Sequence, residues 1–287
     1  MPISLPSLDV STAEVAGTAE ASWGRLVSLL ARENGLAVAF SGGLDSAVLL
    51  DAAIEALGAD RVVAFTAVSP SLAAFELETA RSVARELGAK TLEVPTDELA
   101  DPGYVANAGD RCYYCKRELF AEVKKAGESL GLSAIAYGYH KDDDADVRPG
   151  LKAALEAGVL RPLYEAGLGK KDLREIARAR GRSFAEKPSG ACLSSRLPVG
   201  MTVTEERLGK VEAIEAFLRQ RGFVTFRARL DRDDLVRVEV APSEIARLAS
   251  EMAIDEQRAL LLETARREGI SRVALDLVGY HRAGETG

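Results

Sequence analysis

The stretch from Leu36 to Ser46 (LAVAFSGGLDS) decides the fold of this chain of 287 residues. Its first five residues form a short apolar run that is typical of a buried strand. The residues from Ser46 to Leu57 have the pattern of a helix that Gly58 ends. The two glycines between strand and helix let a ligand approach the backbone closely, and the unpaired N–H groups at a helix start attract phosphate. The stretch therefore predicts a strand, a phosphate-binding loop and a helix.

Asp45 indicates which ligand this loop holds. Next to a phosphate, its carboxylate is repelled unless a cation lies between them, so Asp45 predicts Mg²⁺ bound beside the phosphate. Ser41 and Ser46 add hydroxyl donors. The alternative is an ordinary strand-to-helix turn in which Ser46 caps the helix. The loop is not a Walker A motif, because no Gly-Lys-Ser/Thr follows, and it lacks the GxGxxG pattern of dinucleotide folds.

Strand and helix patterns alternate on both sides of this stretch. Helices are expected at 12–33, 46–57, 72–87 and 113–130, and strands at 36–40, 61–68, 91–94 and 134–137. Such alternation predicts an α/β fold with a parallel sheet and helices on both faces, whose ligands bind at the carboxyl ends of the strands.

The pattern changes after about Ser195. A helix at 205–221, strands at 223–230 and 235–240, a helical stretch at 243–268 and a last strand at 272–277 predict a smaller α+β domain. We therefore expect one domain at 1–198 and a C-terminal domain at 199–287.

The composition excludes several classes of protein. A net charge of −7 and a pI near 5.2 give no overall basic field for nucleic acid. No apolar run is long enough to span a membrane, and residues 1–10 lack the order of a secretory signal. Three cysteines are too few for a disulfide framework. We expect a cytoplasmic protein without a membrane or nucleic-acid partner.

The three cysteines form two motifs. Cys112 and Cys115 belong to a CxxC, and Cys192 lies in a polar stretch in which Lys187 and Arg196 are expected to lower the pKa of its thiol. The alternative for Cys192 is a small buried apolar residue. For the CxxC, a zinc site with a histidine, a redox pair, and a 4Fe–4S cluster held by all three thiols are open.

The loop Ser41–Ser46 resembles the PP-loop of the ATP pyrophosphatases, which transfer AMP to a carboxylate or carbonyl oxygen. The PP-loop, the run 138–150 (GYHKDDDADVRPG) and the run 187–196 (KPSGACLSSR) occur in the same order in the LarE family of ATP-dependent sulfur transferases, and the resemblance extends from about Val15 to Tyr280. His140 departs from that pattern, where asparagine is expected. The resemblance implies that the ATP phosphates and Mg²⁺ are held by Ser41, Gly42, Gly43, Asp45 and Ser46.

Members of this family act in the biosynthesis of the nickel-pincer nucleotide. The resemblance implies a pyridinium mononucleotide substrate whose ring carboxylate is adenylated and then converted to a thiocarboxylate, and a homo-oligomeric enzyme. Some members sacrifice the sulfur of the cysteine equivalent to Cys192, whereas members with three cysteines resemble cluster-dependent enzymes. This chain resembles the second kind, so a [4Fe–4S] cluster on Cys112, Cys115 and Cys192 is expected, with sulfide or another sulfur donor as partner.

Several charged residues are candidates for substrate binding. Arg227 and Arg229 alternate on a predicted strand and would project on one face, where they suit a phosphate; the alternative is a solvated strand face. Arg196 is a candidate partner of a substrate carboxylate, and Glu215 resembles an acidic position of the family near the cysteine site. Asp142, Asp143 and Asp146 form either a second acidic cluster or a solvated loop.

Three other functions compete with sulfur transfer to a small molecule. A tRNA thiolation enzyme would also combine a PP-loop with paired cysteines, but such enzymes usually carry a basic RNA-binding appendage. An amidotransfer or NAD-synthase-type enzyme would leave the cysteines unexplained. A zinc-stabilised regulator would bind ATP without cleaving it.

Overall fold

The computed structural model of the chain describes residues 10–145, 149–188 and 190–280. Its α-helices are α1 Val10–Leu30, α2 Leu44–Leu57, α3 Ala74–Glu86, α4 Pro102–Ala106, α5 Arg111–Ser129, α6 Pro149–Glu156, α7 Pro162–Glu165, α8 Lys170–Ala179, α9 Glu205–Gln220, α10 Ile245–Ala253 and α11 Asp255–Arg267. Its strands are β1 Leu36–Ala39, β2 Val62–Val68, β3 Lys90–Pro95, β4 Ala134–Tyr137, β5 Phe226–Arg232, β6 Leu235–Val240 and β7 Arg272–Leu275. None of these helices, among the residues described, has the length and apolar character needed to cross a membrane.

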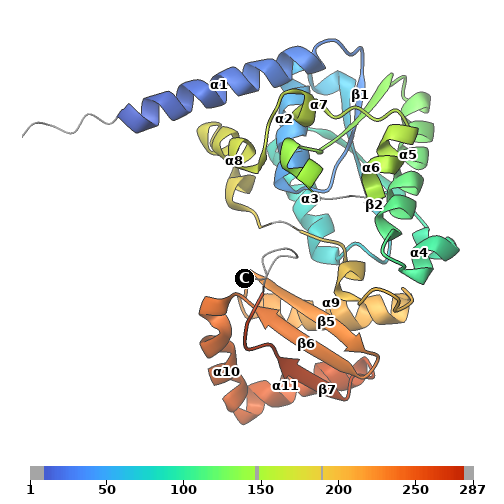
Figure 1. Cartoon of the computed structure of the whole chain (residues 1–287), viewed down its shortest axis with the longest axis vertical. Helices are drawn as coiled ribbons and strands as arrows, with labels where there is room; N and C mark the ends of the chain where they lie inside the picture. Colours follow the sequence, from blue (N-terminus) through green and yellow to red (C-terminus); the bar gives the residue numbers. More distant parts are fainter. Residues whose placement is uncertain (1–9, 146–148, 189, 281–287) are drawn as a thin grey trace, which may run out of the picture. The chain divides into compact units, whose positions relative to one another are not determined.

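The first sheet is parallel, and its strands lie in the order β3-β2-β1-β4. Its two central strands, β1 and β2, are labelled in Figure 1. Leu36 is level with Val62 on one side and Ala134 on the other, so the carboxyl ends of the central strands meet at one edge. The strand β1 is buried along its whole length, which explains why its sequence is a continuous apolar run.

Helices cover both faces of this sheet, as the alternating pattern predicts. Leu36 and Val38 of β1 belong to a core that includes residues of α1, α2, α3 and α8. Ala37 and Ala39, which point to the other face, belong to a core with residues of α5 and α6. The predicted α/β fold with a parallel sheet is confirmed.

The second sheet lies in the C-terminal part of the chain, in the order β5-β6-β7. β5 and β6 form the predicted hairpin, and β7 pairs parallel to β6. The helical stretch expected at 243–268 is interrupted, because α10 ends at Ala253 and Ile254 precedes α11 in an extended conformation. This part is the predicted smaller α+β arrangement.

Two compact units divide the chain, and the second one is built from three separate segments. The first unit contains residues 1–68, 74–96 and 115–190, and the second contains 69–73, 97–114 and 191–287. The C-terminal sheet thus shares its unit with two short segments from the first half of the chain. The sequence pattern gives no sign of this, because it follows only the order of elements. The division into domains at 1–198 and 199–287 stays a prediction.

Candidate functional site

The loop between β1 and α2 is folded tightly on itself. The Ser41 N–H donates to Ser46 Oγ at 3.2 Å, and Ser46 Oγ donates to the Gly43 carbonyl at 3.1 Å. Gly42 has φ +66°, and a Cβ there would lie 2.5 Å from Cα of Ala80 in α3. Gly43, rather than Ser46, is the N-cap, so α2 begins at Leu44, two residues earlier than predicted. Asp45 and Ser46 therefore lie in the first turn of the helix.

Asp45 is paired with a lysine that the sequence analysis did not single out. Lys170, the first residue of α8, donates from Nζ to both carboxylate oxygens of Asp45, at 2.6 and 2.8 Å. The side chain of Asp45 is 27% exposed, so this charge can reach a ligand. No local pattern marks Lys170, since 125 residues separate it from Asp45. Its position next to the loop is a result of the tertiary fold.

A second lysine contacts the loop from another part of the first unit. Lys187 donates from Nζ to the Gly42 carbonyl at 3.1 Å and pairs with Glu76 at 3.0 Å. The sequence predicts that Lys187 lies near Cys192 and lowers the pKa of the Cys192 thiol. The structure shows Lys187 at the phosphate-binding loop, where a cation would complement nucleotide phosphates.

The aspartates after β4 have structural partners. The buried Asp143 accepts the backbone N–H of His140 at 3.2 Å, and Asp142 accepts the backbone N–H of Lys170 at 2.6 Å. His140 is buried, and its Nε2 lies 3.9 Å from Asp45. Asp146, the third residue of the expected acidic cluster, lies outside the described residues.

None of the three cysteines, all of which belong to the described part of the chain, is in a disulfide bond. Cys112 and Cys192 are exposed and Cys115 is half-buried. Cys112 and Cys115 are three residues apart at the start of α5, so they share one side of the helix. Cys115 belongs to the first compact unit, and Cys112 and Cys192 belong to the second.

The chemistry of the thiols suits an iron–sulfur cluster, because three thiols are suitable donors for three irons. Among the residues that the structure describes, no group of three His, Cys, Asp or Glu side chains could hold a single metal ion. A [4Fe–4S] cluster on Cys112, Cys115 and Cys192 stays a prediction from the sequence.

The turn that carries Cys192 is held by a buried ion pair. Arg196 and Glu215, which are 5% and 3% exposed, pair through two contacts of 2.7 and 3.0 Å. Arg196 also donates from Nη1 to the carbonyls of Ala191 and Cys192, at 2.7 and 2.9 Å. Glu215 further accepts the N–H of Ala228 in β5. In this structure the two residues fix the Cys192 turn, and their assignment to substrate stays a prediction.

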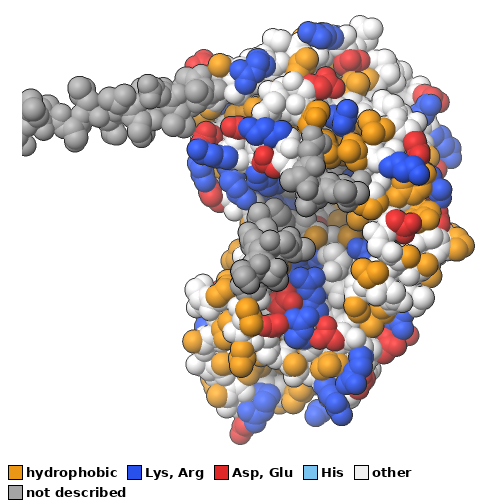
Figure 2. All heavy atoms as spheres, in the orientation of Figure 1, with side chains coloured by type: hydrophobic (Ala, Val, Ile, Leu, Met, Phe, Trp, Pro, Cys, Tyr) orange, Lys and Arg blue, Asp and Glu red, His pale blue; other side chains and the backbone are white. Residues whose placement is uncertain are grey.

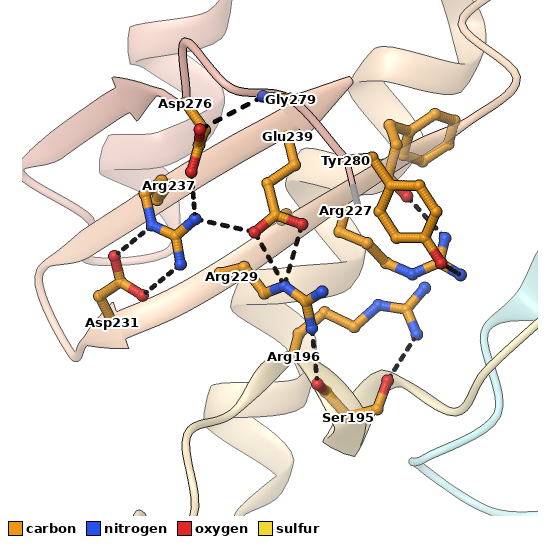
Figure 3. A network of polar contacts seen from close by, with 12 residues as sticks. Ser195, Arg196, Arg227, Arg229, Asp231, Arg237, Glu239, Asp276, Gly279 and Tyr280 are labelled. Carbon is orange, nitrogen blue, oxygen red and sulfur yellow. Dashed lines mark hydrogen bonds and ion pairs between the residues drawn. The ribbon is translucent and has the colours of Figure 1, made fainter. Parts of the chain in front are cut away.

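Arg227 and Arg229 lie on the same face of β5, as the predicted alternation requires (Figure 3). Arg229 pairs with Glu239 at 3.1 Å and donates to the Ser195 carbonyl at 3.0 Å. The guanidinium of Arg227 lies 4.8 Å from the centre of the Tyr280 ring. On the face shown in Figure 2, Lys and Arg side chains over this sheet are interspersed with Asp and Glu.

Arg227 lies in a region of positive charge. Burial lowers its pKa and the positive charges of Arg196 and Arg229 lower it further, while Tyr280 and Glu215 act in the opposite direction. Figure 3 shows the guanidinium groups of these three residues next to each other. An anion placed among them would relieve this repulsion, which is a property expected of a phosphate site.

Comparison with known proteins gives related chains but no matching family model. The chain is 38% identical over 243 residues to an uncharacterized protein of Synechocystis sp., which covers 85% of this chain and 88% of the relative. It is 35% identical over 255 residues to the pyridinium-3,5-bisthiocarboxylic acid mononucleotide synthase of Lactiplantibacillus plantarum, covering 89% and 90%. An uncharacterized protein of Methanocaldococcus jannaschii is 28% identical over 206 residues, covering 71% and 76%.

A parallel sheet whose central strand runs through an SGGxDS loop into a helix defines an enzyme of the PP-loop ATP pyrophosphatase class. Within that class, the similarity to the Lactiplantibacillus synthase extends over nearly the whole of both chains. The chain belongs to the LarE family of sulfur transferases.

Proposed function

We propose that this enzyme adenylates a carboxylate of a pyridinium dicarboxylate mononucleotide with ATP and converts it to a thiocarboxylate. The observation that carries this proposal is the 35% identity to the synthase over 90% of that protein. The PP-loop and the exposed Cys192 supply the two chemical functions that such a reaction needs, namely activation by a nucleotide and transfer of sulfur.

The first step activates the carboxylate. A carboxylate is a poor electrophile because its charge repels nucleophiles and oxide is a poor leaving group. In the proposed step, a carboxylate oxygen attacks the α-phosphorus of ATP and pyrophosphate leaves. The N–H groups at the start of α2, together with Lys170 and Lys187, stabilise the charge that develops on pyrophosphate.

Asp45 is the proposed Mg²⁺ ligand in this step. Mg²⁺ is commonly bound through one or two carboxylates together with phosphate oxygens and water, so a single aspartate beside the phosphates fits the ion. The ion neutralises phosphate charge. Lys170 neutralises Asp45 in the structure and is available to the phosphates once Asp45 binds the ion.

The second step transfers sulfur to the activated carbon. Sulfur attacks the acyl carbon, the carbon–oxygen bond to AMP breaks, and AMP leaves with that oxygen. Arg227 and Arg229 are the proposed partners of the substrate phosphate, because their charges crowd one face of β5. The proposal requires Cys192 whether the sulfur is its own or is delivered as sulfide. Cluster-bound sulfide, the prediction from the sequence, requires Cys112 and Cys115 as well.

The test uses purified enzyme, ATP, Mg²⁺, sulfide and pyridinium-3,5-dicarboxylic acid mononucleotide under anaerobic conditions. We expect pyrophosphate and AMP to form, and the substrate to gain the mass of an oxygen-to-sulfur exchange. A wild-type enzyme that forms neither AMP nor thiocarboxylate would contradict the proposal.

Cysteine variants then identify the source of sulfur. Cys192→Ala is expected to release pyrophosphate and to accumulate the acyl adenylate, but to form no thiocarboxylate. On the cluster route, Cys112→Ala loses iron, acid-labile sulfide and sulfur transfer together, and the mass of the wild-type protein is unchanged after turnover. Loss of the mass of H₂S from the wild-type protein, with an active Cys112→Ala, would instead show that Cys192 gives up its own sulfur.

The competing functions give different products in the same experiment. A tRNA thiolation enzyme would leave the mononucleotide unchanged and thiolate RNA. A nucleotide-binding regulator would release no pyrophosphate with any substrate.

A further inference from the structure

A chain of buried hydroxyl groups leads from the Cys192 turn to a buried carboxylate. Ser194 Oγ lies 2.5 Å from the Tyr104 hydroxyl, which lies 2.7 Å from Ser71 Oγ. Ser71 Oγ donates in turn to Oε1 of Glu98. The exposed fractions of these four side chains are between 0% and 4%. They come from three separate segments of the second compact unit.

The direction of each hydrogen bond in this series of hydroxyl groups follows from Glu98, the carboxylate at its end. The carboxylate oxygen of Glu98 accepts the hydroxyl hydrogen of Ser71. A hydroxyl has one hydrogen to donate, so Ser71 must accept from Tyr104. Tyr104 has then used its own hydrogen and must accept from Ser194. All hydrogens therefore point from the Cys192 turn toward Glu98.

The same residues hold the backbone beside Cys192. The N–H of Leu193 donates to the Ser71 carbonyl at 2.9 Å, while Arg196 binds the Cys192 carbonyl from the other side. The thiol itself remains exposed. Burial raises the pKa of Tyr104, and a negative charge on Cys192 would raise it further, so the phenol keeps its hydrogen.

We propose that Tyr104, fixed through Ser71 by Glu98, is a positioning residue that holds the Cys192 turn so that the thiol is presented for sulfur transfer. This inference rests on the role of Cys192 in the proposed function. It assigns a purpose to buried polar groups which would otherwise only cost desolvation free energy.

The experiment compares Tyr104→Phe and Ser194→Ala with wild type in the two half-reactions. Each variant removes one side of the same hydrogen bond. We expect thiocarboxylate formation to fall about tenfold in each, the effect of a lost buried hydrogen bond. Pyrophosphate release and the KM for ATP are expected to stay within about twofold. The loss of one hydrogen bond mainly affects the groups that share a partner with it. A merely structural defect would lower both half-reactions together.

The double variant tests whether the two residues act as one unit. Tyr104→Phe combined with Ser194→Ala is expected to transfer sulfur no more slowly than Tyr104→Phe alone, since that variant already breaks the contact with Ser194. Fully additive losses would mean that the two residues act independently and would overturn the inference.

Ser69→Ala is the matched control, because Ser69 donates to the same oxygen of Glu98 but lies outside the path to Ser194. Amide exchange at Leu193 is the local readout, and it is expected to rise in Tyr104→Phe but not in this control. If wild type makes thiocarboxylate and Tyr104→Phe equals it, the inference fails. If wild type makes none, the proposed function fails, while the exchange data still test the positioning.

Discussion

The charge of Asp45 is balanced by a lysine from a distant part of the chain, and this pairing shows how single residues define the site. A loop with two glycines and two serines could bind phosphate without any carboxylate. The ion pair of 2.6 Å with Lys170 orients Asp45 at the start of α2. In the proposed function a metal ion replaces Lys170 as the partner of Asp45 when ATP binds, and both side chains are partly exposed.

Replacing Asp45 by asparagine tests this role. We expect Asp45→Asn to lower pyrophosphate release by about a hundredfold, the effect of removing one preorganised charge-stabilising group. Release is measured at saturating ATP over a range of Mg²⁺ concentrations. Asp60→Asn is the control, since it removes the exposed Lys90–Asp60 pair at the opposite ends of the strands, and it should leave the rate unchanged. Normal turnover by Asp45→Asn would remove Asp45 from the metal site.

At the scale of elements, the close approach of the loop to α3 shapes the site. Gly42 is the point of contact, because its backbone has φ +66° and its position leaves no room for a Cβ beside Ala80. Gly58, at the other end of α2, has φ +80° but open space around it. Substitutions at the two glycines therefore distinguish the cost of the backbone conformation from the cost of a steric clash.

We expect Gly42→Ala to abolish pyrophosphate release and to destabilise the enzyme more than Gly58→Ala does. Alanine at Gly58 meets open space but must adopt φ +80° and ψ 148°, a conformation that costs a residue with a Cβ about 1–3 kcal/mol. Alanine at Gly42 must also displace the backbone of α3. Urea unfolding and ATP turnover measure both effects. Equal destabilisation by the two variants would show that the contact with Ala80 is easily relieved.

The start of α8 is a second element that positions a charge. Asp172 accepts the Gly169 N–H at 2.7 Å and the Lys141 ammonium at 2.9 Å, one turn from Lys170. Burial raises the pKa of Asp172, but these two hydrogen bonds outweigh it and leave the pKa below its usual value. A lowered pKa in the folded state stabilises the protein above the unfolded pKa, and this stabilisation is lost as the pH falls through the folded pKa.

Asp172→Ala is therefore expected to lower the free energy of unfolding by about 1 kcal/mol at neutral pH, the usual value of a helix cap. The difference from wild type should shrink as the pH falls below the usual range of an aspartate. Urea unfolding at several pH values measures it. Glu175→Ala on the same helix removes only the 3.8 Å surface contact with Lys171 and should have little effect. A difference that does not depend on pH would contradict the cap.

At the scale of the whole molecule, the second compact unit depends on segments that precede it by about a hundred residues. Asn107, which is buried with φ +49°, donates to the carbonyls of Pro198 and Met201 at 2.8 and 3.0 Å. The Val203 N–H donates to the Val105 carbonyl. The segment 97–114 is thus joined by hydrogen bonds to the chain on both sides of residue 198.

A chain that ends at residue 198 tests this dependence. It would leave residues 97–114 without α9 and the second sheet, so we expect lower solubility and a lower melting temperature than those of the full chain. A chain that ends at residue 280 keeps every described contact and serves as control. A shortened chain that melts like wild type would support an independent domain at 1–198.

The predictions from the sequence were most successful where the pattern is local. β4 and β6 have the predicted bounds, and most other strands and helices differ by one to three residues, because burial repeats with the period of each element. Errors arise where local patterns compete, as in the stretch 243–268, which looks continuous but breaks at Ile254. The roles predicted for Cys112, Cys115, Arg196, Glu215, Arg227 and Arg229 stay predictions.

The sequence by itself determined the parallel sheet, the loop between its strand and helix, and the family, because apolar periodicity and short motifs are properties of neighbouring residues. Only the tertiary structure decided that Lys170 pairs with Asp45, that Arg196 binds Glu215, and that Tyr104 lies under the Cys192 turn. These contacts join residues between 19 and 125 positions apart. They form because folding places the ends of separate elements together, which no local pattern records.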